Sequence, residues 1–250
     1  MSKTFLNLDR AIITSMVQAD NPERIKELMD KSVSGGAEAF GMQFEQLKPE
    51  YRNKEVYKEL FSHAGENAVY ATNYRLAGNE GKTDEMLAEE LVELAECGVT
   101  LCDVMGDFFD RQPDEVAVDE TAIEKQMDLI DKLHEKGAEV LMSSHIFKFT
   151  PAERVLEVAL EHQRRGADIS KIVTGAESAE EELENLKIVN MLKEKLDIPF
   201  LFLCNGECRI FRKIAGEFGN CMYLCVYEHD ELSSKGQPLL KTVKAVRDNI

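Results

Sequence analysis

The chain has 250 residues, of which 44% are hydrophobic and 31% charged, and its formal net charge is −17. This composition is typical of a globular protein, and the length suits one large α/β domain (residues 1–250) better than two small ones. The negative charge argues against a nucleic-acid-binding or anionic-membrane surface, because no basic block offsets it. A small anionic substrate remains compatible, since a few cations facing a pocket can dominate it locally.

The predicted elements alternate between short apolar runs and stretches with helical spacing along the whole chain. The runs predicted as strands are 11–17, 37–44, 68–75, 99–103, 139–145, 169–174, 199–204 and 220–227. The helices predicted between them are 22–34, a stretch around 57–61, 84–97, 119–136, 150–165, 178–196, 207–218 and 238–249. Eight strand-then-helix units, without a Gly-x-Gly-x-x-Gly motif after the first strand, predict a closed (β/α)8 TIM barrel.

Location and cysteine chemistry follow from the same pattern. The first ten residues lack the apolar segment of a signal peptide, and no apolar run approaches the roughly 18 residues that span a bilayer. We therefore expect a cytoplasmic protein with no membrane contact, in which the six cysteines are free thiols. The pairs Cys204/Cys208 and Cys221/Cys225 do not have a usual zinc spacing, so no metal site is expected.

The stretch 139–174 contains the residues that point most directly to chemistry. A predicted strand ends in His145, a helix follows, and the next strand carries Lys171. Parallel strands joined by one helix place equivalent ends side by side, so the two side chains are expected to lie close together. Desolvation lowers a lysine pKa from about 10.4, which lets the neutral amine attack a carbonyl, while a histidine moves protons near neutral pH. The alternative is that both are ordinary structural residues near strand ends.

The predicted barrel also says where a site must lie. In this architecture functional residues stand at the C-terminal ends of the strands and in the loops that follow. The polar residues expected there are Gln43, Glu45, Arg75, Glu80, Asp103, His145, Lys171, Arg212, Ser233 and Gln237. Each alone is better explained as a capping or loop residue, but together they predict a pocket with two arginines, a lysine and a histidine. Such a pocket suits a small carboxylated carbonyl compound, because guanidinium matches a carboxylate bidentately.

Two segments resemble the type I 3-dehydroquinate dehydratases, (β/α)8 enzymes of the shikimate pathway that work through a lysine imine. Residues 143–151, Ser-Ser-His-Ile-Phe-Lys-Phe-Thr-Pro, are similar to the family's Ser-x-His-Asp-Phe-x-x-Thr-Pro. Residues 166–172, Gly-Ala-Asp-Ile-Ser-Lys-Ile, are similar to its Gly-Ala-Asp-Ile-x-Lys-Ile. The resemblance implies that Lys171 forms an imine with the ketone of 3-dehydroquinate. His145 then removes the adjacent C–H proton and helps the β-hydroxyl leave as water, which gives 3-dehydroshikimate for aromatic amino acid biosynthesis, without a cofactor.

Shorter matches extend the resemblance from about Tyr70 to Gln237. Residues 71–75 resemble the family's Thr-Phe-Arg strand end and residues 80–81 its Glu-Gly pair, which implies that Arg75 contacts substrate and that Glu80 orients His145. Asp103 falls where the family has an aspartate on the fourth strand.

Two further matches lie late in the chain. Residues 209–212 resemble a Lys-Ile-Ser-Arg segment, which implies that Arg212 holds the substrate carboxylate. Residues 233–237 resemble a Ser-Ala-Pro-Gly-Gln lid, which implies that Ser233 and Gln237 close over the bound ring. Barrels of this family often pair, so a homodimer is compatible with the resemblance.

The second predicted strand departs from the family. The family ends this strand with Glu-x-Arg-x-Asp, whereas this chain has Gln43 and Glu45 at the two polar positions and no arginine. Glu45 there is expected to remove a substrate contact and add a repelling charge. This keeps open a divergent paralogue, a lysine-imine lyase or aldolase acting on a different carboxylated hydroxy-ketone. A non-catalytic barrel that binds a small anion or a protein is a third hypothesis, disfavoured because a buried unpaired lysine costs stability.

Overall fold

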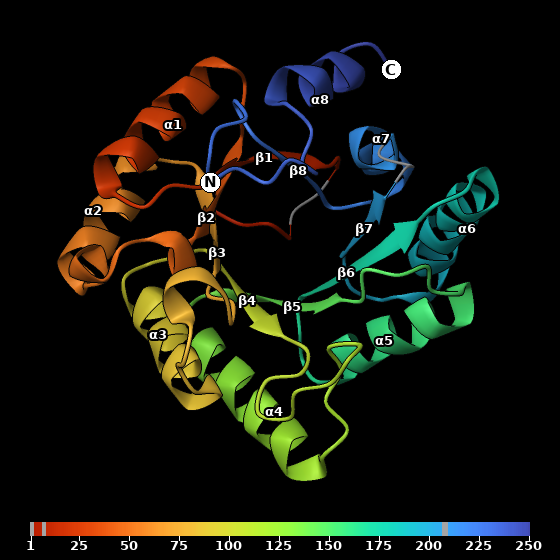
Figure 1. The fold of residues 1–250 in the computed structure, drawn as a ribbon, viewed down its shortest axis with the longest axis horizontal. Helices are drawn as coiled ribbons and strands as arrows, with labels where there is room; N and C mark the ends of the chain where they lie inside the picture. Colours follow the sequence, from red (N-terminus) through yellow and green to blue (C-terminus); the bar gives the residue numbers. More distant parts are fainter. Residues whose placement is uncertain (1–2, 7–8, 207–209) are drawn as a thin grey trace.

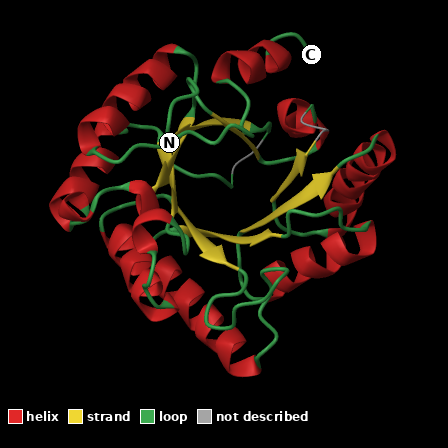
Figure 2. Cartoon of the chain, in the orientation of Figure 1, coloured by secondary structure: helices red, strands yellow, loops and turns green. Residues whose placement is uncertain are grey.

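Eight parallel strands form a near-closed barrel surrounded by α-helices in the computed structural model, which describes residues 3–6, 9–206 and 210–250 (Figures 1 and 2). The strands are β1 (Ile12–Val17), β2 (Ala39–Gln43), β3 (Ala68–Thr72), β4 (Leu101–Met105), β5 (Glu139–His145), β6 (Ile169–Ala176), β7 (Phe200–Gly206) and β8 (Met222–Cys225). The helices are α1 (Pro22–Ser34), α2 (Lys54–His63), α3 (Asp84–Glu96), α4 (Glu120–Glu135), α5 (Ala152–Arg164), α6 (Ala179–Lys195), α7 (Phe211–Phe218) and α8 (Leu240–Arg247). The predicted TIM barrel is therefore confirmed.

Two strand ends differ from the prediction in ways that matter for the site. The third strand ends at Thr72 instead of Arg75, because the Asn73 side chain turns out of the sheet and donates to the Leu87 carbonyl and to Glu90. The seventh strand continues to Gly206, and its predicted following helix begins at Phe211; residues 207–209 lie outside the described part of the chain.

Local signals in the sequence explain the helix starts and the buried faces. The Asn21, Asn53, Thr83, Asp119 and Ser178 side chains accept from the first turns of α1, α2, α3, α4 and α6, which satisfies backbone donors that have no partner within the helix. In α4 the buried residues recur at helical spacing and pack against the barrel, and they are Ala122, Gln126, Leu129, Ile130 and Leu133.

The barrel closes between β7 and β8 through a side chain. The hydrogen-bonded strand order runs β7-β6-β5-β4-β3-β2-β1-β8, so the described strands form no ladder between β7 and β8. Asn220 bridges the gap, accepting from the Phe202 amide at 3.0 Å and donating to the Phe202 carbonyl at 2.7 Å. The Cys221 amide also donates to the Phe200 carbonyl at 2.8 Å. These bonds satisfy backbone groups that an open edge would leave unpaired.

The barrel interior is filled by apolar side chains at its N-terminal end and by polar ones above them. Phe5 is fully buried among strand residues that include Leu101, Leu141 and Ile169. The Phe5 amide donates to a Glu139 carboxylate oxygen at 2.8 Å, which ties the N-terminal segment to β5. Because side chains alternate along a strand, residues two positions further up each strand face the interior one layer higher.

One buried arginine holds the loop between β4 and α4. Arg165 donates from Nη1 to the Gly106 carbonyl (3.0 Å) and the Gln126 side chain (2.7 Å), and from Nη2 to the Ala117 carbonyl (2.9 Å). Gly106 is required where the loop folds back, since a Cβ there would lie 2.5 Å from the Glu115 carbonyl oxygen. The loop is thereby held against the end of β5.

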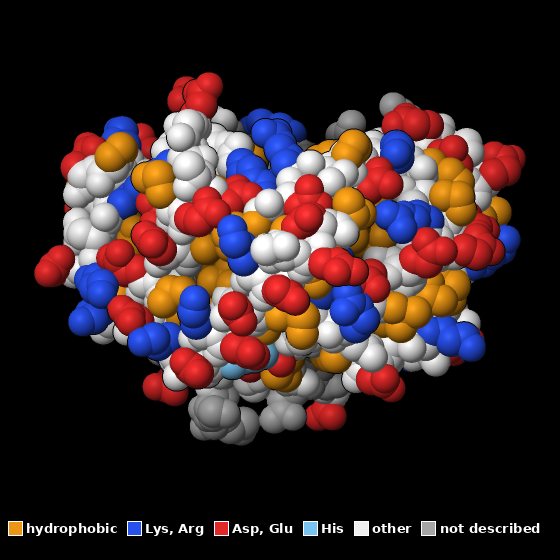
Figure 3. All heavy atoms as spheres, turned by 90° about the horizontal axis from the view of Figure 1, so that it is seen from below, with side chains coloured by type: hydrophobic (Ala, Val, Ile, Leu, Met, Phe, Trp, Pro, Cys, Tyr) orange, Lys and Arg blue, Asp and Glu red, His pale blue; other side chains and the backbone are white. Residues whose placement is uncertain are grey.

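Charges of both signs are interspersed over the face shown in Figure 3. Many surface pairs join them, for example Arg164 with Glu161 and Lys187 with Glu184. Within the described ranges, no helix has both the length and the apolar character that a bilayer crossing needs.

We predict that Arg165→Met lowers the free energy of unfolding by about 2–4 kcal/mol, because it removes the buried side-chain donor to the Ala117 carbonyl and to Gln126 Oε1 and one of the donors to the Gly106 carbonyl. Urea denaturation measures the change. Arg164→Met is the matched control: that side chain is 54% exposed and pairs with Glu161, so about 1 kcal/mol or less is expected. Equal small losses in both variants would contradict the structural role of Arg165.

Candidate functional site

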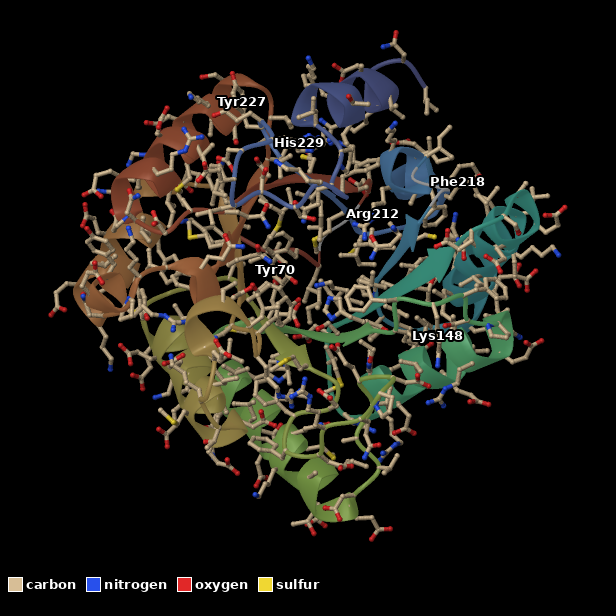
Figure 4. The ribbon with its side chains drawn as sticks, viewed as in Figure 1. Tyr70, Lys148, Arg212, Phe218, Tyr227 and His229 are labelled. Atoms are coloured by element: carbon tan, nitrogen blue, oxygen red, sulfur yellow. The ribbon has the colours of Figure 1, made fainter. Side chains whose placement is uncertain are left out.

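A pocket of about 830 Å³ opens at the C-terminal ends of the strands. Six of the ten residues predicted from the sequence line it: Gln43, Arg75, His145, Lys171, Arg212 and Gln237. The other four, Glu45, Glu80, Asp103 and Ser233, are not among its lining residues. Figure 4 shows Tyr70 and Arg212 toward the middle of the ring, with Phe218 and Tyr227 further out.

Lys171 stands inside the barrel because of the alternation along β6. Ile169 and Val173 share the interior with it, whereas Ile172 packs outward against the helices. The Lys171 ammonium group is almost fully buried and donates to Tyr74 Oη at 2.6 Å, Tyr70 Oη at 3.0 Å and Asp103 Oδ2 at 3.1 Å. The lysine is therefore paired, and the cost of an unpaired buried lysine does not arise.

Asp103 is the counter-charge beneath the pocket. It accepts from Ser143 Oγ and Tyr74 Oη at 2.5 Å each, and from Tyr70 Oη. Burial alone would raise the pKa of this carboxyl, but the charge of Lys171 and the three hydroxyl donors outweigh it and hold the pKa below its ordinary value. Asp103 thus remains a carboxylate in contact with the lysine.

His145 is oriented by Glu115, a residue that the sequence analysis did not select. Both the His145 backbone amide and ring Nδ1 lie 2.8 Å from Glu115 Oε2. The imidazole stacks on Phe147 at 5.7 Å and meets the Tyr74 ring edge-on at 5.2 Å between centroids. A carboxylate on Nδ1 fixes the tautomer and the ring orientation, which leaves Nε2 as the nitrogen available for proton transfer.

The structure does not bring Glu80 to His145. Glu80 is exposed at the end of the 3-10 turn Ala77–Asn79, and Glu115 occupies the position at the histidine. Glu115 has a positive φ of 48° within an irregular loop, so no periodic pattern marks it. The only available signal was that its loop follows a strand end.

Arg212 is the buried cation that faces the pocket. Its Nε donates to the Cys204 carbonyl and its Nη2 to Asn205 Oδ1, both at 2.7 Å. Among the described residues no carboxylate pairs with it, and burial lowers the pKa of its guanidinium to about 10. Residue 209, the first of the segment 209–212 that carries the family resemblance, lies outside the described residues.

Arg75 also lines the pocket, but other residues occupy its guanidinium. Nε and Nη2 bind the two Asp84 oxygens and Nη1 binds Asp107, each at 2.7 Å. The sequence predicts a pocket with two arginines. Because Asp84 and Asp107 pair with Arg75, the pocket carries less positive charge than that prediction implies. Arg111, from the loop after β4, lines the rim and makes no ion pair with a described residue.

The end of β2 contributes the Gln43 amide to the pocket, whereas the Glu45 carboxylate in the turn after β2 does not line it. Gln43 accepts from Gln18 and from Gln46, and Gln18 in turn accepts from the Ser234 amide at 2.9 Å. Glu45 lies in the 3-10 turn Phe44–Gln46, fully buried, where the Thr72 hydroxyl contacts both its oxygens. The repelling charge expected in the pocket is consequently not among the lining groups.

The loop after β8 covers the other side. Ser233 folds into a turn in which the Asp230 amide donates to its Oγ at 2.7 Å. Gln237 lines the pocket with a buried Oε1 that has no hydrogen-bond partner among the described residues, and Ser234 lines it in place of Ser233. In the described part of the chain no group of three or more His, Cys, Asp and Glu residues could hold a metal ion.

A family model, curated relatives and solved structures all include 3-dehydroquinate dehydratases among the proteins similar to this chain. Residues 15–249 match the family model described as Type I 3-dehydroquinase. The 3-dehydroquinate dehydratase of Listeria monocytogenes is 29% identical over 185 residues, covering 72% of this chain and 68% of the relative. That of Listeria welshimeri is 33% identical over 96 residues, so the match spans only 38% of each chain.

Solved structures show the same fold at low identity. The 3-dehydroquinate dehydratase of Geobacillus kaustophilus superposes with a TM-score of 0.82 at 17% identity, covering 98% of this chain and 94% of the other. The type I enzyme of Clostridium difficile, solved with covalently modified comenic acid, gives a TM-score of 0.80 at 18% identity, covering 98% and 96%.

We predict that Glu45 makes the stability of the fold depend on pH. Burial raises the pKa of its carboxyl to about 7 from 4.5. Because the folded pKa is the higher one, the contribution to stability is complete below about pH 4.5 and is lost as the pH rises through about 7. Glu45→Gln should therefore gain about 2–3 kcal/mol relative to the unsubstituted protein between pH 5 and pH 8.

Urea denaturation at both pH values measures this gain. Glu124→Gln, at an exposed position of α4, is the control and should show no pH-dependent difference. A Glu45→Gln difference that is the same at pH 5 and pH 8 would refute the shifted carboxyl.

Proposed function

Because the chain belongs to the type I 3-dehydroquinase family, we propose that it dehydrates 3-dehydroquinate to 3-dehydroshikimate through an imine on Lys171. The observation that carries the proposal is the placement of a buried lysine and a carboxylate-oriented histidine on the wall of one pocket. In this role the reaction is a step of the shikimate pathway, and it needs no group beyond the chain's own side chains.

The two side chains divide the chemistry between them. The Lys171 amine adds to the substrate ketone, and loss of water gives a protonated imine that withdraws electrons from the neighbouring carbon. His145, held at Nδ1 by Glu115, takes the C–H proton from that carbon and then gives a proton to the departing β-hydroxyl. The covalent ligand of the Clostridium difficile relative is consistent with covalent chemistry in this family.

The pocket's other groups support a substrate with one carboxylate and several hydroxyls. Arg212, buried and without a carboxylate partner among the described residues, offers its charge to a carboxylate. The Gln43, Gln237 and Asn205 amides both donate and accept, which suits ring hydroxyls. 3-Dehydroquinate has this combination, one carboxylate and several hydroxyls on a ring that carries a single ketone.

A different carboxylated hydroxy-ketone is the second candidate, for a lysine-imine lyase or aldolase. It is favoured by Glu45, which stands at the position of the family's second-strand arginine, and by Arg75, whose charge Asp84 and Asp107 neutralise. Lys171 pairs with Asp103 and His145 pairs with Glu115. These two pairs argue against a barrel that only binds a ligand, because binding alone would not need them.

We predict that borohydride added to a mixture of the protein and 3-dehydroquinate traps an adduct on Lys171, seen by mass spectrometry and peptide mapping. Lys171→Ala should give no adduct and no enone absorbance. Lys148→Ala, which removes a 68% exposed lysine that pairs with Asp114, should behave as the unsubstituted protein. A folded protein that gives neither adduct nor enone would refute this substrate, and other carboxylated ketones would then be tested the same way.

We predict that Arg212→Met raises KM for 3-dehydroquinate by about 100-fold, equivalent to about 2.7 kcal/mol of lost binding, with a smaller effect on kcat. Steady-state kinetics of enone formation measure both constants. Lys213→Met removes the neighbouring cation of α7, which does not line the pocket, and should change KM less than about threefold. An unchanged KM in Arg212→Met would exclude this arginine as the carboxylate anchor.

A further inference from the structure

Three groups surround the Lys171 nitrogen, but they do not all reach the pocket. Asp103 is 1% exposed and is not among the lining residues, whereas Tyr70 and Tyr74 both line the cavity. The Tyr70 and Tyr74 hydroxyls bond both Asp103 and the Lys171 nitrogen. A proton can therefore pass through these hydroxyls from Asp103 to a ligand bound to Lys171.

Tyr74 is the better placed of the two tyrosines. Its Oη lies 2.6 Å from Lys171 Nζ and 2.5 Å from Asp103 Oδ2, against 3.0 Å from Tyr70 Oη to the same nitrogen. Tyr74 is 9% exposed, whereas Tyr70 is fully buried. The Tyr74 ring also meets the His145 ring edge-on, at 5.2 Å between centroids, so Tyr74 contacts both the lysine and the histidine.

The Tyr74 hydroxyl can give its proton to a ligand only if another group returns a proton to it at once. Burial and the neighbouring Asp103 charge raise the pKa of the Tyr74 phenol well above its ordinary value, so it keeps its proton at neutral pH. Asp103, within hydrogen-bond distance of both groups, can replace a proton that Tyr74 gives away once it has itself taken a proton from the Lys171 ammonium. The resemblance described from the sequence pairs residues 71–75 with a Thr-Phe-Arg strand end, in which a phenylalanine precedes the arginine. The hydroxyl is thus a feature of this chain.

We propose that Tyr74 is a catalytic acid that passes a proton from Asp103 to the carbinolamine hydroxyl during imine formation on Lys171. The inference rests on the proposed function and adds to it the group that expels the first water. His145 keeps its separate task at the neighbouring C–H bond.

The steps balance in atoms and charge. The Lys171 ammonium gives one proton to Asp103, and the neutral amine forms a bond to the ketone carbon. A proton moves from the new N–H to the alkoxide, which gives a neutral carbinolamine. Tyr74 donates its proton to that hydroxyl, the C–O bond breaks, water leaves, and the nitrogen lone pair forms the C=N bond.

The last proton transfer restores the charges that the site had before the reaction. Asp103 returns its proton to Tyr74 and becomes a carboxylate again, now beside a protonated imine. The ion pair that existed with the ammonium is therefore restored with the iminium, and no net charge is created in the buried site. The reverse sequence releases the product.

The test separates imine formation from the later dehydration. Protein and 3-dehydroquinate are mixed rapidly and quenched with borohydride at increasing times, and the adduct fraction is followed by mass spectrometry. Tyr74→Phe should slow adduct formation about 100-fold. Tyr70→Phe, which removes the other hydroxyl at the same nitrogen, should slow it less than tenfold. Tyr223→Phe removes a phenol that bonds Glu217 outside the pocket lining, and should have no effect.

A conservative variant gives a readout that a structural role would not move. Incorporation of 3,5-difluorotyrosine at position 74 keeps the hydroxyl but makes it more acidic, so it should rescue the rate lost in Tyr74→Phe. It should also shift the alkaline limb of the pH profile for imine formation to lower pH. This variant decides the question if circular dichroism shows that Tyr74→Phe is poorly folded.

Each result has one meaning. Adduct formation in the unsubstituted protein together with normal rates in Tyr74→Phe overturns the role of Tyr74 and leaves the proposed function standing. Equal slowing by Tyr70→Phe and Tyr74→Phe, or an unshifted pH profile with difluorotyrosine, also overturns it. Absence of any adduct in the folded unsubstituted protein overturns the proposed function and this inference together.

Discussion

The buried ion pair between Lys171 and Asp103 is the constraint on which the rest of the site depends. Two opposite charges inside a barrel are tolerated only when every remaining donor and acceptor is satisfied. Tyr70, Tyr74 and Ser143 do this from β3, from the loop after β3, and from β5. The strand register sets Ser143 beside Lys171, and the alternation along each strand turns these side chains inward. The lysine's position and its hydrogen-bond partners therefore depend on several strands together.

A second constraint acts through the loop after β4. Arg165, at the end of α5, bonds the Gly106 and Ala117 carbonyls, and that loop in turn brings Glu115 to His145. The histidine's orientation thus depends on a buried cation that does not line the pocket. Bonds to the residue that ends α5 thus hold the base of the loop, while Arg111 of the same loop lines the pocket.

The electrostatics of the pocket are set locally, in contrast to the chain's net charge of −17. Most pocket charges are neutralised by near neighbours: Arg75 by Asp84 and Asp107, and Lys171 by Asp103. Among the described residues Arg212 has neutral hydrogen-bond partners, and burial lowers the pKa of its guanidinium. A ligand carboxylate would provide the counter-charge for Arg212 that the described protein groups do not. Binding of the ligand would then also neutralise the buried guanidinium.

The sequence alone determined the barrel, the bounds of β5 and the position of His145 and Lys171 on neighbouring strands that border one pocket, because these follow from eight repeated apolar runs and from right-handed parallel crossovers. Only the tertiary structure decided which carboxylates serve the site. Glu115 replaces the expected Glu80 because irregular loops are fixed by distant partners such as Arg165, which leave no periodic trace. Glu45 turns toward Thr72 because the chain leaves β2 in a 3-10 turn, and Tyr74 reaches the lysine because β3 ends at Thr72. Strand patterns are local, whereas loop side chains are placed by contacts between residues far apart in the chain.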